Sequence, residues 1–144
     1  MPRPRLGVAQ ATVYAAEEAT VARWGRTWST VRDAQAYADG VVGSAWFFER
    51  WPALVRVTIE RRGSGATWST CHALDGPGPQ GIPTEGVILL AGPVFAQATI
   101  LHELAHLLLP PDAGHGPEFT ATLLELVRRE MGFHAFAELR RAIS

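Results

Sequence analysis

Apolar residues recur at two different spacings along this chain, and each spacing predicts a different kind of element. Between Val31 and Phe48 they lie three or four positions apart, which is typical of a helix that buries one face. Thr30 followed by Asp33 resembles a capping box with Asp in place of Glu, so this helix is expected to begin just after Thr30. Residues 54–62 instead alternate between apolar and polar side chains, and this pattern predicts a strand with one face in solvent.

The rest of the chain predicts two more strands and further helices. Residues 66–74 are expected to pair with the preceding strand as a hairpin, since Gly63 and Gly65 supply a turn between them. Residues 7–17 contain enough β-branched side chains for a short strand, but residues 15–25 fit a helix equally well. The last predicted elements are a short buried strand at 86–92 and helices at 93–109, 117–131 and 134–143. Helix first, then a small sheet, then helices is the element order of an α+β fold.

Composition and charge narrow the class of protein. The 144 residues suit one domain, residues 1–144, and a chain with 47% apolar and 19% charged residues is expected to fold rather than stay disordered. The net charge of −1 gives no general attraction to nucleic acid, and no apolar run approaches the roughly 20 residues of a membrane span. The single cysteine, Cys71, excludes an intramolecular disulfide and a cysteine-based zinc ribbon. Because the segment after Met1 lacks the apolar stretch of a signal peptide, a cytoplasmic location is expected.

Candidate chemistry is concentrated in the segment LHELAHLLLPPDAGHGPEF, residues 101–119, which holds three of the chain's five histidines. Its first part has the form HExxH, with His102 and His106 one helical turn apart and therefore on nearly the same helix face. Two imidazoles in this arrangement can bind one zinc ion, and Glu103 is placed to take a proton from a water on that ion. Incidental histidines on a helix are the alternative explanation of this spacing.

A third imidazole is expected from His115. Two prolines end the helix, and the residues that follow can reverse the chain and return His115 toward the first two histidines. Pro117 suits the first position of the next helix, so His115 would lie at the start of that helix. Catalytic zinc commonly has three protein ligands and a water. The predicted site is therefore one Zn²⁺ bound by His102, His106 and His115, with Glu103 as the general base of a hydrolase.

The stretches HELAHLLL and GHGPEF resemble the SprT/Spartan group of zinc metallopeptidases, in which the HExxH helix is followed by a loop and a GHGxxF-like segment. The preceding GVILLAGPVF is similar to that group's strand and linker, so the specific likeness covers residues 86–119. Over its whole length the chain resembles a family of short bacterial proteins with only a provisional assignment as metallohydrolases. The resemblance implies a zincin-like fold with a small, mostly antiparallel sheet packed on helices. It also implies a peptide or protein substrate, with a substrate strand paired to a sheet edge beside the metal.

The sequence is also compatible with two functions other than a zinc metallopeptidase. A non-catalytic zinc-binding interaction protein would need a fourth protein ligand, for which the sequence offers no strong candidate. A metallohydrolase that acts on a non-peptide amide or ester would use the same motif. Nucleic-acid binding is not expected, because the chain has no basic tail and pairs such as Arg61 and Arg62 are more typical of solvated faces.

Several residues outside the motif are weaker candidates. His72, Tyr14 and Tyr37 could stabilise a developing oxyanion, although a local hydrogen bond is the more ordinary role of a strand histidine. Glu118 could orient a ligating histidine, but a favourable charge at a helix N-terminus explains it as well. Cys71 is expected to be a small buried residue.

Overall fold

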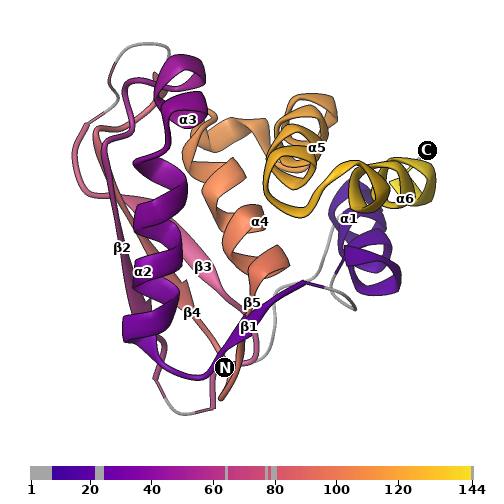
Figure 1. The fold of residues 1–144 in the computed structure, drawn as a ribbon, viewed down its shortest axis with the longest axis horizontal. Helices are drawn as coiled ribbons and strands as arrows, with labels where there is room; N and C mark the ends of the chain where they lie inside the picture. The colour runs from indigo at the N-terminus through magenta and orange to yellow at the C-terminus, as the bar shows by residue number, and fades with distance from the viewer. Residues whose placement is uncertain (1–7, 22–24, 64, 77, 79–80, 144) are drawn as a thin grey trace.

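The structure is a computed structural model that describes residues 8–21, 25–63, 65–76, 78 and 81–143 (Figure 1). Its helices are α1 (Val8–Ala19), α2 (Val31–Val42), α3 (Ala45–Arg50), α4 (Gln97–Leu107), α5 (Pro117–Met131) and α6 (Phe133–Ile143), with a 3-10 turn, η3 (Pro111–Ala113). Its strands are β1 (Thr27–Trp28), β2 (Arg56–Arg61), β3 (Thr70–Ala73), β4 (Glu85–Leu90) and β5 (Phe95–Ala96). The combination of helices with small sheets confirms the α+β class.

The main sheet has the strand order β2-β4-β3, so the last of the three strands along the chain lies in the middle. β2 pairs with β4 in parallel, whereas β3 pairs with β4 antiparallel. The predicted hairpin between residues 54–62 and 66–74 is therefore wrong, and this sheet is mixed rather than mostly antiparallel. Burial explains the order, because β4 is an almost continuous apolar run that suits the centre of a sheet. β3 is exposed at two of its four positions and suits an edge.

The two edges of this sheet have different neighbours. Gln35 of α2 reaches the backbone of β2, where its amide group donates to the Val57 carbonyl at 2.8 Å and accepts from the Ile59 N–H at 2.7 Å. A side chain thus occupies backbone groups that another strand could otherwise pair with. β3 forms the opposite edge and packs against α4, so it is the edge strand that lies beside the HExxH motif.

α6 packs on α5 and on α1, whereas α4 lies between the sheet and α5 (Figure 1). Its close approach to the sheet depends on Gly86 in β4, because a Cβ at this position would meet Cδ1 of Leu107 at 2.7 Å. The core around α4 includes the fully buried side chains of Ile88, Leu104 and Phe119. The HExxH helix is therefore packed on two sides.

Several helix boundaries differ from those predicted. The N-terminal segment forms α1, so the strand at residues 7–17 is wrong for the residues described. The alternative helix is correct in kind, but it covers Val8–Ala19 rather than residues 15–25. The Thr30 side chain accepts from the Asp33 N–H at 3.1 Å, as the capping pattern predicts, but the helix is interrupted at Gly43 and resumes as α3. α4 begins at Gln97, because the two residues before it form β5 and pair with β1.

None of the helices in the described ranges combines the length and the apolar character that a bilayer span requires. Residues 1–7, part of the segment in which no signal peptide is predicted, lie outside those ranges.

Candidate metal centre

The fold brings together the three histidines of residues 101–119. His102 and His106 lie one turn apart on α4. η3 follows, and then Gly114, whose φ of 60° lies in the left-handed region that favours glycine, so the chain changes direction after α4. Pro117 is in the first turn of α5, as predicted, and α5 packs on α4. His115 therefore lies just before a helix that is held against the one that carries the other two histidines.

The ring nitrogens of these histidines converge on one point. Nε2 of His115 lies 3.1 Å from Nε2 of His102 and 3.0 Å from Nε2 of His106. All three candidate ligand atoms lie within 4.8 Å of one another. A tetrahedral zinc ion with Zn–N distances of ~2.0–2.1 Å separates its ligand nitrogens by roughly 3.3 Å. The three side chains can therefore hold a metal ion with only small adjustments of their rings.

Burial keeps these imidazoles neutral, which is the state that binds metal ions. The pKa of His102 and that of His115 are lowered to about 4, and that of His106 to about 3, mainly by loss of hydration. For His106 and His115 the charge of neighbouring imidazoles contributes to the same lowering. Each ring can thus offer a nitrogen lone pair at neutral pH. Three imidazole donors favour zinc and related transition metals over Mg²⁺ or Ca²⁺.

Phe119 supports the cluster from α5 and is fully buried. Its ring stacks on that of His106, with centroids 4.4 Å apart, and its centroid lies 4.9 Å and 4.7 Å from those of His102 and His115. One phenyl ring therefore contacts all three imidazoles and limits how far they can turn. The sequence includes Phe119 in the GHGPEF likeness, but its packing role depends on how α5 lies against α4.

A buried carboxyl group that the sequence analysis missed also contacts the cluster. Oε1 of Glu17, on α1, lies 2.5 Å from Nδ1 of His102. Glu17 is 7% exposed, and burial raises its pKa to about 8. Local patterns could not identify this residue, because it precedes His102 by 85 positions.

Of the two tyrosines considered as oxyanion donors, Tyr14 lies at the cluster and Tyr37 does not. The Tyr14 ring stacks on that of His102, with centroids 4.8 Å and planes 15° apart. The Tyr37 hydroxyl donates to Glu130 and accepts from Gln97, both at 2.9 Å, and so links α2 to α5 and α4. Tyr14 thus stays a candidate for the site, whereas the contacts of Tyr37 are those of a packing residue.

Glu103, the predicted general base, is 4% exposed on α4. It shares a side-chain hydrogen bond with Cys71 of β3, and burial is the main cause that raises the pKa of the Glu103 carboxyl to about 8. Burial also raises the pKa of Cys71, so its sulfur stays a thiol that can donate to the carboxyl group. Cys71 is thus a half-buried hydrogen-bond donor rather than only a small buried residue.

A cavity of about 310 Å³ adjoins the cluster. Its lining includes His102 and Glu103 from α4, Tyr14 from α1 and Trp68 from the segment before β3. The candidate base and one candidate metal ligand therefore face the same space, which is of a size that can receive part of a small molecule or a peptide side chain.

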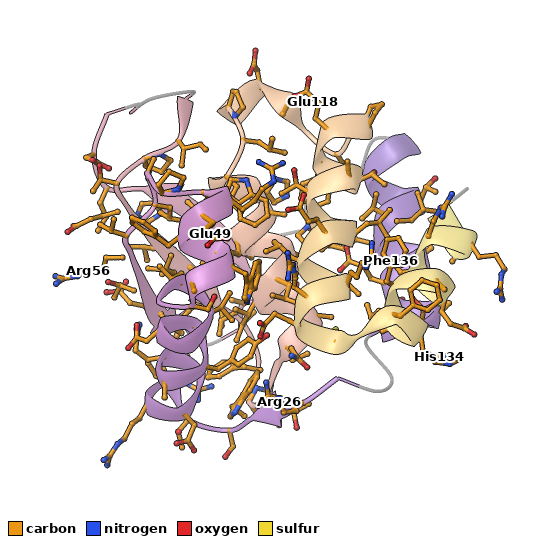
Figure 2. All side chains as sticks on the ribbon, turned by 45° about the horizontal axis from the view of Figure 1, so that its top comes forward. Arg26, Glu49, Arg56, Glu118, His134 and Phe136 are labelled. Atoms are coloured by element: carbon orange, nitrogen blue, oxygen red, sulfur yellow. The ribbon has the colours of Figure 1, made fainter. Side chains whose placement is uncertain are left out.

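The remaining candidates are exposed at the surface. His72 is exposed on β3, and because side chains alternate along a strand it lies on the opposite face from Cys71. Glu118 is exposed in the first turn of α5 and lies at the surface of the molecule (Figure 2). These positions favour a local role for His72 and a helix N-terminal charge for Glu118.

The chain matches no protein-family model, no curated protein and no solved structure. The chemistry of the site is therefore what indicates the function of this chain.

Proposed function

We propose that this protein is a zinc-dependent hydrolase, and specifically a metallopeptidase, in which His102, His106 and His115 bind one Zn²⁺ and Glu103 is the general base. The observation that carries the proposal is the convergence of three imidazole nitrogens on one point, with a buried carboxyl group on the same helix. A zinc ion bound there would supply a Lewis acid and lower the pKa of a water toward about 7.

Glu103 would carry out the proton transfers. It lines the same cavity as His102, so a water or a substrate group in that cavity comes within its reach. A nearby cation favours the ionised form of a carboxyl group, and this form accepts a proton from water. Glu103 can then return the proton to the leaving amine. The hydrogen bond with Cys71 limits the orientations of the carboxyl group during both transfers.

The outer edge of β3 suits an extended peptide substrate. The Leu74 N–H donates to the Glu85 carbonyl, and hydrogen-bonded pairs alternate along an antiparallel ladder. By this alternation, the backbone N–H and C=O groups of Cys71 and Ala73 point away from β4 and toward the outer edge. A substrate strand added at this edge would lie beside α4, close to Glu103.

The number of protein ligands distinguishes a catalytic zinc from a structural one. A structural zinc has four protein ligands, whereas a catalytic zinc keeps a position for water. Among the described residues, the group of ligand-type side chains at this point has three members, His102, His106 and His115. This set supports catalysis over a purely structural or binding role.

The proposal is tested by comparing wild-type protein with Glu103→Gln after both have been loaded with zinc. Each protein is incubated with a diverse peptide mixture and, separately, with amide and ester substrates, and the products are identified by mass spectrometry. We expect equal zinc content and a loss of hydrolysis of at least about 100-fold in the Gln variant. Glu49→Gln is the control and should keep full activity, because Glu49 carries an exposed carboxyl group on α3 (Figure 2).

Three results would contradict the proposal in whole or in part. Equal hydrolysis by wild type and Glu103→Gln would exclude Glu103 as the base. Zinc-loaded wild type that cleaves none of the substrates would favour the non-catalytic role. Cleavage of amides or esters without cleavage of peptides would keep the chemistry and exclude the peptidase assignment.

A further inference from the structure

Helix α1 directs two side chains at the same histidine. Glu17 contacts Nδ1 of His102 at 2.5 Å, and Tyr14, three residues earlier, stacks on the ring of His102. Residues three apart lie on one face of a helix, so α1 presents both groups to His102 at once. His102 is 2% exposed, and solvent therefore has little access to the Nδ1 position that Glu17 occupies.

The contact at Nδ1 determines what the other ring nitrogen can do. A neutral imidazole has one N–H and one lone pair. Burial favours the protonated form of Glu17 in the metal-free fold, but a cation bound beside His102 would favour the carboxylate, which only accepts hydrogen bonds. When Nδ1–H donates to Glu17, the lone pair is at Nε2, the atom that lies 3.1 Å from Nε2 of His115. The other tautomer would turn an N–H toward the point shared by the three rings and would exclude a metal ion from it.

We propose that Glu17 is a positioning residue of the metal centre, which selects the metal-binding tautomer of His102 and holds its ring in place. Among the described contacts of the three histidines, a carboxyl group at the second ring nitrogen is present for His102 alone. The inference rests on the proposed function, because it concerns a ligand of the proposed ion. It adds a residue from a different helix, far from the HExxH segment in sequence.

A purely structural role, in which Glu17 only attaches α1 to α4, makes different predictions. Burial of a carboxyl group beside a neutral ring costs hydration free energy, so the nearly isosteric and uncharged Gln should not weaken the metal-free fold. Metal affinity should nevertheless fall. The Gln amide is a weaker acceptor, and its NH₂ group can also donate to Nδ1 and so favour the tautomer that does not bind metal.

The experiment uses the full chain as wild type, Glu17→Gln and Glu18→Gln. Zinc affinity is measured by competition with a chromogenic chelator, and the free energy of unfolding of each metal-free protein is measured in urea. Glu18→Gln is the matched control, since it removes the same formal charge from the adjacent, exposed position of α1. We expect the zinc dissociation constant to rise about 10–100-fold in Glu17→Gln. It should stay unchanged in Glu18→Gln.

A spectroscopic measurement tests the position of the ring directly. The d–d absorption bands of Co²⁺ bound in place of zinc depend on ligand geometry, so they should shift or weaken in Glu17→Gln and stay unchanged in Glu18→Gln. If metal-free Glu17→Gln does not fold, Glu17→Asp answers the same question. It keeps the charge but withdraws the carboxylate from Nδ1 by one methylene group, and we expect it to lose zinc affinity as well.

The possible outcomes separate this inference from the proposed function. Wild-type affinity in Glu17→Gln or, if that variant does not fold, in Glu17→Asp would overturn the positioning role and leave the three-histidine site intact. Equal losses in Glu17→Gln and Glu18→Gln would also overturn it, because a general charge effect would then explain them. A wild-type protein without measurable zinc affinity would overturn the metal site itself, and the positioning role with it.

Discussion

Nε2 of His106 lies 3.0 Å from Nε2 of His115, although His106 is in the last turn of α4 and His115 follows the η3 turn. Two neutral imidazoles at this distance can share only one N–H between their facing nitrogens. The same arrangement around a cation would use a lone pair from each ring. The pair can therefore serve as two ligands of one ion, with His102 as the third.

Removal of any one of these imidazoles should remove the metal. His102→Ala, His106→Ala and His115→Ala each delete one donor of three, and we expect the zinc content of the purified protein to fall at least about tenfold. Inductively coupled plasma mass spectrometry after dialysis against a weak chelator measures this content. His72→Ala is the control, because His72 is an exposed histidine on β3, and this variant should retain a single zinc ion per chain.

His115→Ala is the decisive variant, because His115 is the one candidate ligand outside the HExxH motif. Full zinc content in that variant would exclude the three-histidine site and would indicate that a different side chain completes the coordination.

Phe119→Ala should weaken both the fold and the site. Phe119 is fully buried and contacts the three imidazole rings, so its truncation leaves a cavity beside them. We expect the free energy of unfolding, measured in urea, to fall by about 3–5 kcal/mol. Phe48→Ala is the control, since Phe48 is 62% exposed and its loss should cost less than about 0.5 kcal/mol. A similar loss in both variants would show that Phe119 is not a core residue.

The candidate ligands could be predicted from the sequence because their relationship is local. His106 lies four positions after His102 on one helix, and His115 lies nine positions further along, beyond two prolines. Glu17 could not be predicted, because its contact with His102 depends on the packing of a helix 85 positions away. The contact between Glu103 and Cys71 also depends on packing, since it requires β3 to be the sheet edge beside α4.

The fold shows the same division between local and distant relationships. Periodicity predicted α5 with its observed ends, Pro117 and Met131, because a helix with one buried face has a local signature. Strand order has no such signature. The alternation at residues 54–62 predicted β2 but could not reveal that β4, rather than the next strand in sequence, pairs with it. The apolar run of β4 was the available signal, since continuous burial is typical of a central strand.

Gly86→Ala should destabilise the protein at the contact between β4 and α4. The added Cβ would lie 2.7 Å and 2.8 Å from the two terminal methyl groups of Leu107, which is itself buried, so α4 or the Leu107 side chain would have to move. We expect a loss of about 1–3 kcal/mol in the free energy of unfolding. At Gly63 a Cβ would meet no atom within 4 Å, so Gly63→Ala is the matched control. Equal effects of the two substitutions would contradict the close approach of α4 to the sheet.

The stability of the metal-free protein should depend on pH through Glu103. Burial raises the pKa of this carboxyl from 4.5 to about 8 in the fold, so the folded state binds its proton more tightly than the unfolded state does. The resulting stabilisation is fully present below about pH 4.5 and is lost as the pH rises through about 8. Glu103→Gln carries no titrating group at this position. The stability of the Gln variant relative to wild type should therefore increase by a few kcal/mol between about pH 5 and pH 8.

Urea unfolding in the presence of a chelator measures this difference at each pH. Glu17 is present in both proteins, so the pH dependence of the difference reports residue 103 together with its electrostatic coupling to Glu17. Glu18→Gln provides the control, because it removes an exposed carboxyl group of α1 in place of the buried one. A stability difference for Glu103→Gln that stays constant or shrinks as the pH rises would mean that Glu103 is not held protonated by burial. In that case its carboxyl group would already be ionised before a cation binds.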